Sequence, residues 1–136
     1  MPVPTPPSVA ADAVVEQRAY DAALDLFKSG NYNGAIAGFA NFVRTYPRGA
    51  LAPSAQYWLG NSQFAQRDFR GAIATQRQLV QIYPDSQKVP DALLNIATSQ
   101  FELGDGAASR RTLEDLIARY PQSDAATKAR QRLAIR

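Results

Sequence analysis

The sequence predicts an all-α protein, a right-handed superhelix of three helical hairpins followed by a C-terminal capping helix. Three observations support this fold class. Apolar residues recur at the spacing of a helix, strand-like alternation appears nowhere at convincing length, and one segment is repeated three times at an interval of 37 residues. A repeated unit of this length that holds two helices is typical of a helical repeat array, in which each hairpin is covered by the next.

The first eleven residues differ in composition from the rest. Residues 2–8, PVPTPPS, hold four of the nine prolines, and proline supports neither a helix interior nor a strand ladder. Residues 1–11 are therefore predicted to be a Pro-rich, disordered linker, with ordered structure from about Asp12. The segment MPVPTPPSVAAD also lacks the charged start and the apolar run of a secretory signal.

The first hairpin follows this linker. Its first helix carries an apolar stripe at positions i, i+3, i+4 and i+7, formed by Tyr20, Ala23, Leu24 and Phe27. We expect this helix to end at Gly30-Asn31, since glycine adopts the left-handed conformation that terminates many helices. The second helix is expected to stop at Tyr46-Pro47, because proline disfavours a helical residue before it.

The same pattern then recurs twice. Residues 17–47 align without gaps with residues 54–84 and 91–121, and each copy ends in a Tyr-Pro pair. The alignment predicts one domain over residues 12–136. Within it we expect repeats at about 12–49, 50–86 and 87–122 and a capping helix at about 123–134.

The composition argues against catalysis. The chain contains no cysteine and no histidine, so most metal sites and most general-base triads cannot be assembled. The sequence also lacks a glycine-rich phosphate loop and a metal-ligand spacing. We therefore predict a protein that is not an enzyme and has no catalytic residues, cofactor or metal.

The net charge of +3 is concentrated near the C-terminus, where the last acidic residue, Asp124, is followed by Lys128, Arg130, Arg132 and Arg136. Such a cluster is compatible with nucleic-acid binding. Cations are also stabilising at the C-terminal end of a helix. We favour the second interpretation and predict no nucleic-acid partner. No apolar run approaches the roughly 20 residues of a membrane span, so we predict no direct membrane insertion.

The spacing of small residues and prolines resembles the tetratricopeptide repeat. Each first helix carries a small residue, which is Ala23, Gly60 or Ala97. A second small residue follows twelve positions later, at Ala35, Ala72 or Ser109. A proline follows after twelve more positions, at Pro47, Pro84 or Pro121. The usual unit has about 34 residues, so we place three extra residues after each proline and expect the next first helix to be about one turn longer. Ser86 and Ser123 are expected as N-caps, and Pro53 and Pro90 within first turns.

In tetratricopeptide superhelices the first helix of each pair lines the concave face. The resemblance implies a partner-binding groove for an extended or helical peptide, formed by Tyr20, Leu24, Lys28, Tyr57, Asn61, Phe64, Leu94 and Thr98. We do not expect a chaperone-type carboxylate clamp, which uses Lys, Arg and Asn side chains. Asn61 matches one of these, but its groove neighbours Tyr57, Leu24 and Leu94 are not cations. A partner in this groove would be held by apolar burial and by hydrogen bonds from Tyr and Asn.

Some side chains of the first helices could line either the groove or the core. Framework residues recur in every copy, and on that ground we predict core positions for Phe27, Phe64 and Phe101. We predict exposed positions for Tyr20, Tyr57 and Asn61. Trp58 points about 100° away from Tyr57 around the helix, so we expect it to pack against the second helix or the preceding repeat.

Longer segments resemble one family: AYDAAL, FVRTYPRGALAPSAQYWLGNSQFAQRDF, LVQIYPDSQKVPDALLNIATSQFELGD and LIARYPQSDAATKARQRL. They are similar to the C-terminal domain of the periplasmic Tol-Pal-associated cell-division coordinators of Gram-negative bacteria. The resemblance covers about residues 16–134. Its most specific features are the Y-P-x-S segments and the closing A-x-x-x-A-x-x-R-L pattern of residues 125–133.

This resemblance implies a non-catalytic protein-protein interaction module located in the periplasm. Members of the family contact TolA, an inner-membrane protein of the Tol-Pal system, and a bifunctional penicillin-binding protein. Through these partners they coordinate peptidoglycan synthesis with outer-membrane constriction during cell division. Full-length members trimerise through an N-terminal coiled coil that is not part of this sequence, and PVPTPPS is similar to the end of the linker after it.

Two alternatives stay open. One is a scaffold subunit of an outer-membrane assembly machine, a tetratricopeptide lipoprotein with similar Y-P-x-S repeats. That protein normally has five repeats after a lipidated cysteine, whereas this sequence has three and no cysteine.

The other alternative is an accessory domain that binds glycan strands of peptidoglycan directly, for which Tyr20, Tyr57 and Asn61 would suit sugar stacking and hydrogen bonding.

Overall fold

The computed structural model describes residues 9–135, which fold into seven α-helices and contain no strand. The helices are α1 (Val9–Lys28), α2 (Tyr32–Thr45), α3 (Ala52–Ala65), α4 (Phe69–Ile82), α5 (Val89–Glu102), α6 (Gly106–Arg119) and α7 (Asp124–Ala134). The predicted all-α class, with three hairpins and a final helix, is confirmed. Helix α1 begins three residues before the expected start at Asp12, and residues 1–8 of the predicted linker lie outside the described residues.

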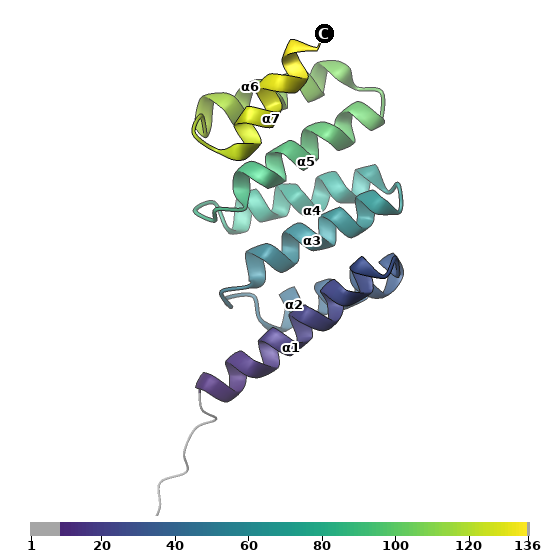
Figure 1. Ribbon diagram of the computed structural model, residues 1–136, viewed down its shortest axis with the longest axis vertical. Coiled ribbons are helices and arrows are strands. Elements are labelled where there is room, and N and C mark those ends of the chain that lie inside the picture. Colours follow the sequence, from purple (N-terminus) through teal and green to yellow (C-terminus); the bar gives the residue numbers. More distant parts are fainter. Residues whose placement is uncertain (1–8, 136) are drawn as a thin grey trace, which may run out of the picture.

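The hairpins stack in two layers along one axis (Figure 1). The first helices α1, α3 and α5, together with α7, form the nearer layer, and α2, α4 and α6 lie behind them. Each helix packs against the next one in the chain, and each first helix also contacts the first helix of the following repeat. Within residues 9–135 no such contact joins α2 to α4 or α4 to α6. The stack is therefore a helical-repeat superhelix, concave along the first helices and convex along the second helices.

The turn inside each hairpin is built the same way three times. In the first hairpin Gly30 has a φ of 83°, and the next N–H, that of Asn31, donates to the carbonyl of Leu26, five residues back. This geometry is the Schellman ending of a helix. The side chain of Asn31 then caps α2 by accepting a backbone hydrogen bond. The corresponding pairs in the other hairpins are Arg67-Asp68 and Gly104-Asp105.

The Tyr-Pro pairs end the second helices, as the sequence predicts. Tyr46, Tyr83 and Tyr120 are the C-cap residues of α2, α4 and α6, and each N–H still donates to a carbonyl of its helix. Their backbones have left the helical region because proline follows. The hydroxyl of Tyr83 also donates to the carbonyl of Pro47 at 2.7 Å, which ties the end of the second repeat to the end of the first.

The three extra residues of each repeat form turns rather than helix. Helices α3 and α5 each have 14 residues, as do α2, α4 and α6, so the prediction of longer first helices is wrong. Pro53 and Pro90 fall in the first turns, as predicted. Ser123 caps α7 as predicted, whereas Ser86 accepts a hydrogen bond from the N–H of Lys88 inside the turn before α5. This turn absorbs the residues that were expected to lengthen the helix.

Small residues lie where the two helices of a hairpin cross. In the third hairpin the hydroxyl of Ser109 donates to the carbonyl of Ala97 at 2.8 Å, which requires a close approach of α5 and α6. The middle hairpin is tighter still. A Cβ atom added to Gly60 would lie 2.2 Å from Nε2 of Gln76, so this crossing has no room for even a methyl group.

The apolar core is formed by two groups of side chains. One joins α1, α2 and α3, and the larger one runs from α4 through α7. Buried amides of the middle hairpin lie between them. Gln56 donates to the carbonyl of Thr75, and Gln76 donates to the carbonyl of Tyr57. The middle repeat thus joins its two helices partly by hydrogen bonds from buried amides to backbone carbonyls.

Candidate functional site

A hollow of about 240 Å³ lies on the concave side between α3 and α5. We call it the α3–α5 hollow. Three residues of α3, four of α5 and one of α7 line it: Tyr57, Asn61, Phe64, Asp91, Leu94, Asn95, Thr98 and Arg132. Five of the eight predicted groove residues are among them, namely Tyr57, Asn61, Phe64, Leu94 and Thr98. The structure therefore brings together the predicted residues of the second and third repeats.

Polar side chains cross this hollow from helix to helix. The amide nitrogen of Asn95 donates to Oδ1 of Asn61 at 2.5 Å, which links α5 to α3. The guanidinium of Arg132 donates to the hydroxyl of Thr98, which links α7 to α5. Oδ1 of Asn95 is buried and accepts no hydrogen bond from the described residues. An unpaired buried acceptor costs free energy, so this oxygen makes the middle of the array less stable.

Tyr57 contributes an aromatic ring and a hydroxyl to the hollow. Nζ of Lys88 lies 5.1 Å from the ring centroid, a cation–π arrangement. Burial raises the pKa of the Tyr57 hydroxyl above its ordinary value of about 10. A hydrogen bond with Asn61 lowers this pKa, and the negative charge of Asp91 raises it. Because the net shift is upward, the hydroxyl is neutral at physiological pH and can donate a hydrogen bond.

The three predicted groove residues of α1 lie outside the hollow. Tyr20 packs edge-on against Phe39 and Phe42 of α2, with ring centroids 5.9 and 6.1 Å away. It is half-buried against the core, so the prediction that it is exposed is wrong. Leu24 packs against the same core group, and Lys28 is exposed at the end of α1.

Trp58 of α3 explains why the groove residues of the first repeat do not line a hollow whereas those of the second and third repeats do. The ring of Trp58 lies 5.1 Å from that of Phe27, so Trp58 fills the space between α1 and α3. This confirms that Trp58 packs against the preceding repeat. The residue 37 positions later is Asn95, and the next is Arg132. Because an asparagine is far smaller than a tryptophan, the equivalent space between α3 and α5 stays open.

The recurring phenylalanines are less buried than their repetition predicts. Phe27 is half-buried against Trp58, and Phe64 is half-buried with its ring 5.2 Å from that of Phe69. Phe101 is 56% exposed, so its predicted core position is wrong. Helix α7, which packs against α5 in the place of a further first helix, has Arg132 at the position of Trp58. Phe101 and Arg132 line one hollow at the C-terminal end of the array, where no further repeat covers the ring.

Sequence reasoning missed Asp91, Asn95 and Arg132 as residues of the hollow. Asn95 and Arg132 share the alignment column of Trp58, and that column carries the missing signal: a large residue closes the space and a small one opens it. Tyr57 and Asn61 were expected to be exposed, but both are half-buried. The hollow combines aromatic and aliphatic surface with amide and hydroxyl groups, which suits binding.

Two kinds of site are not found among the described residues. Over residues 9–135, no group of three acidic side chains lies together in a way that could hold a metal ion. In the same part of the chain, no helix is long and apolar enough to cross a membrane.

Comparison with known proteins gives one family and one set of relatives. The model of the family described as "YfiO: Outer membrane lipoprotein" matches residues 12–135. Two relatives, both named Cell division coordinator CpoB and both from Pseudomonas putida, one of them from strain KT2440, are 40% identical to this chain over 65 residues. The aligned stretch is 48% of this chain and 24% of each relative's length. The resemblance to the cell-division coordinators is thereby confirmed.

Proposed function

The chain belongs to the YfiO family, described as outer membrane lipoprotein, and from this premise we propose that it is a non-catalytic protein-interaction module acting in cell division. The name of the relatives, cell division coordinator, supports the process. The absence of cysteine and histidine agrees with a role in binding rather than in catalysis.

The observation that carries the proposal is the α3–α5 hollow. Its volume of about 240 Å³ falls below the ~300 Å³ at which small-molecule pockets begin, so it is sized for side chains of a protein partner. Tyr57, Phe64 and Leu94 offer surface for an apolar side chain of that partner. The neutral hydroxyl of Tyr57 and the amide of Asn61 offer hydrogen bonds to its backbone.

We further propose which partners the module serves. They are a TolA-like inner-membrane protein of the Tol-Pal system and a bifunctional penicillin-binding protein, and the place is the periplasm. In this role the chain coordinates peptidoglycan synthesis with outer-membrane constriction. The proposal rests on the resemblance of the Y-P-x-S repeats and on the relatives' name.

The experiment uses a variant that the chain itself suggests. Asn95→Trp places at the α3–α5 hollow the residue that fills the equivalent space one repeat earlier, where Trp58 packs on Phe27. We expect this variant to remain folded and to bind a periplasmic TolA fragment at least tenfold more weakly, as measured by isothermal titration calorimetry. Tyr57→Ala, which removes the ring from the hollow, should weaken the same interaction.

Two control variants test whether the loss of affinity is specific to the α3–α5 hollow. Gln122→Trp adds the same bulk at an exposed turn, and Lys128→Glu with Arg130→Glu reverses two exposed charges of α7 that do not line the hollow. Both should bind the TolA fragment as the unmodified chain does. Full affinity of Asn95→Trp would show that the groove is not the binding surface. Loss of affinity in the Lys128 and Arg130 variant alone would assign binding to the basic face of α7.

A second candidate follows from the family description itself. An outer membrane lipoprotein family supports a scaffold subunit of an outer-membrane assembly machine. Affinity capture with the folded domain distinguishes the two, since this candidate predicts capture of subunits of that machine and the first predicts capture of the TolA fragment.

A titration of isotope-labelled protein with peptidoglycan fragments tests direct glycan binding, which predicts chemical-shift changes at Tyr57 and Asn61.

A further inference from the structure

A second recessed surface lies on the convex side, over α5 and between α4 and α6. It consists of two adjoining hollows of about 300 and 310 Å³, which share Arg77 and Gln100. We call them together the convex groove. Leu93 and Ile96 of α5 are among the residues that line it, and both are nearly fully buried, so they form its floor.

The fold produces this groove directly. Helices α4 and α6 do not contact each other within the described residues, whereas both pack closely against α5. The second helices therefore spread apart and leave one side of α5 recessed between them. At 100° per residue, the floor residues Leu93 and Ile96 lie on the side of α5 opposite to Leu94 and Asn95, which line the α3–α5 hollow. The two surfaces are thus separate.

The convex groove is rich in unpaired positive charge. Arg70, Arg77 and Arg111 line it, all three are exposed, and none forms an ion pair with a carboxylate of the described residues. An arginine cluster without acidic partners favours an anionic ligand, because guanidinium groups form paired hydrogen bonds with carboxylates.

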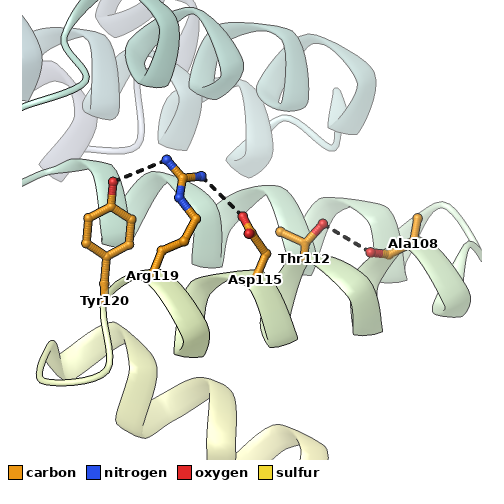
Figure 2. Close-up of polar contacts among 5 residues, drawn as sticks. All are labelled: Ala108, Thr112, Asp115, Arg119 and Tyr120. Carbon is orange, nitrogen blue, oxygen red and sulfur yellow. Dashed lines mark hydrogen bonds and ion pairs between the residues drawn. The ribbon is translucent and has the colours of Figure 1, made fainter.

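The acidic residues beside these arginines have other partners. Asp115 forms an ion pair with Arg119 at 3.2 Å, one turn further along α6, as Figure 2 shows. The guanidinium of Arg119 in turn lies against Tyr120, so this pair is held at the C-terminal end of α6. Asp105 accepts the backbone hydrogen bond that caps the same helix. The charges of Arg77 and Arg111 are therefore left for a partner.

We propose that the convex groove binds an extended acidic peptide segment of a partner protein, with carboxylates paired to Arg77 and Arg111 and apolar side chains resting on Leu93 and Ile96. The apolar floor favours a peptide over a nucleic acid. Binding of single strands relies on aromatic side chains on which bases stack, and none lines this groove.

The test uses a dye-labelled decapeptide of Glu, Asp and Leu and a matched peptide of Gln, Asn and Leu, followed by fluorescence anisotropy at two salt concentrations. The acidic peptide should bind more tightly than the neutral one and lose affinity as salt rises. Arg77→Gln with Arg111→Gln should weaken binding at least tenfold. The control, Arg48→Gln with Lys128→Gln, removes the same charge at exposed positions elsewhere and should change the affinity less than twofold.

A second measurement does not depend on the variants. In an NMR titration of the unmodified chain, the acidic peptide should shift the methyl signals of Leu93 and Ile96 and leave those of Leu94 unchanged. Equal loss of affinity in both double variants, or equal binding of both peptides, would overturn the proposal. Tighter binding of a single-stranded oligonucleotide or of anionic vesicles would overturn the assignment to a peptide. Because the surfaces are separate, Asn95→Trp should bind the acidic peptide normally, whatever its affinity for TolA.

Discussion

At the scale of single residues, two side chains depart from the pattern of their repeat. Arg67 occupies the left-handed position that Gly30 and Gly104 fill in the other hairpins, with a φ of 65°. Gln76 occupies the position of Phe39 and Leu113 and is fully buried. Both departures lie in the middle repeat, and each introduces a feature that lowers the stability of the fold. From the sequence alone each is visible only as a change of residue type.

Arg67→Gly should be more stable than Arg67→Ala by about 1 kcal/mol, because both lose the contact with the ring of Phe69 and only glycine relieves the left-handed strain. Urea unfolding followed by circular dichroism measures the difference. Equal stability of the two variants would mean that the backbone at this turn is not strained.

Gln76→Leu removes the buried, unpaired Oε1 of Gln76 together with the hydrogen bond from its Nε2 to the carbonyl of Tyr57, so two effects of about 1 kcal/mol each should nearly cancel in the free energy of unfolding. Gly60→Ala alone should cost about 1–3 kcal/mol, because the new methyl group meets the amide of Gln76. In the Gln76→Leu background that cost should shrink. Additive effects in this double-mutant cycle would contradict the close approach of the two side chains.

At the scale of elements, the sequence predicts most of the fold because its signals are local. The turns at Gly30 and Gly104, the stops at the Tyr-Pro pairs and the cap at Ser123 depend on residue chemistry within one turn of the chain. The hollow could not be predicted in the same way. It depends on which side chain of the next repeat, Trp58 or Asn95, covers the first helix, and that is a contact across 30 or more residues.

Periodicity itself misled the prediction for Phe101. Repetition indicates a framework position only while another repeat follows to cover it, and here α7 follows instead, with Arg132 in the covering column. The lengths of α3 and α5 were mispredicted for a related reason. Extra residues between two helices can extend either a helix or a turn, and the proline at the second helical position fits both outcomes.

Tyr83→Phe should cost about 0.5–1.5 kcal/mol, the usual contribution of one hydrogen bond, because its hydroxyl joins the second repeat to the carbonyl of Pro47 in the first. Tyr46→Phe is the matched control, since no hydrogen bond of its hydroxyl is found among the described residues, and it should cost less. Thermal unfolding of both variants makes the comparison. Equal losses would show that the seam between these repeats is held by ring packing alone.

At the scale of the whole molecule, stability is shared between neighbouring hairpins rather than concentrated in one core. The two apolar groups meet at a middle repeat with buried amides, so this repeat couples the two ends of the array. The concave and convex surfaces are opposite sides of the same stack. A partner on either side therefore contacts more than one repeat and stabilises their mutual packing.

The free energy of unfolding should fall as the pH rises above about 10. Burial raises the pKa of Tyr20, Tyr57 and Tyr83 above that ordinary value. The folded state therefore keeps these protons to higher pH than the unfolded state, and the stabilisation that is complete below pH 10 is lost as the unfolded chain ionises first. Urea unfolding between pH 8.5 and 11 measures the decline. The double variant Tyr57→Phe with Tyr83→Phe should show a shallower decline, and an identical slope would contradict this origin.

The pairing of Gly60 with Gln76 also bears on how faithfully the chain assembles. Three similar hairpins can exchange partners, either within one chain or between two chains at high concentration, and such swapping is a common failure of repeat proteins. If α4 took α1 or α5 in place of α3 as its hairpin partner, the amide of Gln76 would meet Ala23 or Ala97 instead of a glycine. If α3 took α2 or α6 in place of α4 as its hairpin partner, Gly60 would leave a void beside Phe39 or Leu113. The middle hairpin thus distinguishes its own two helices from those of its neighbours, which favours a single arrangement over swapped multimers.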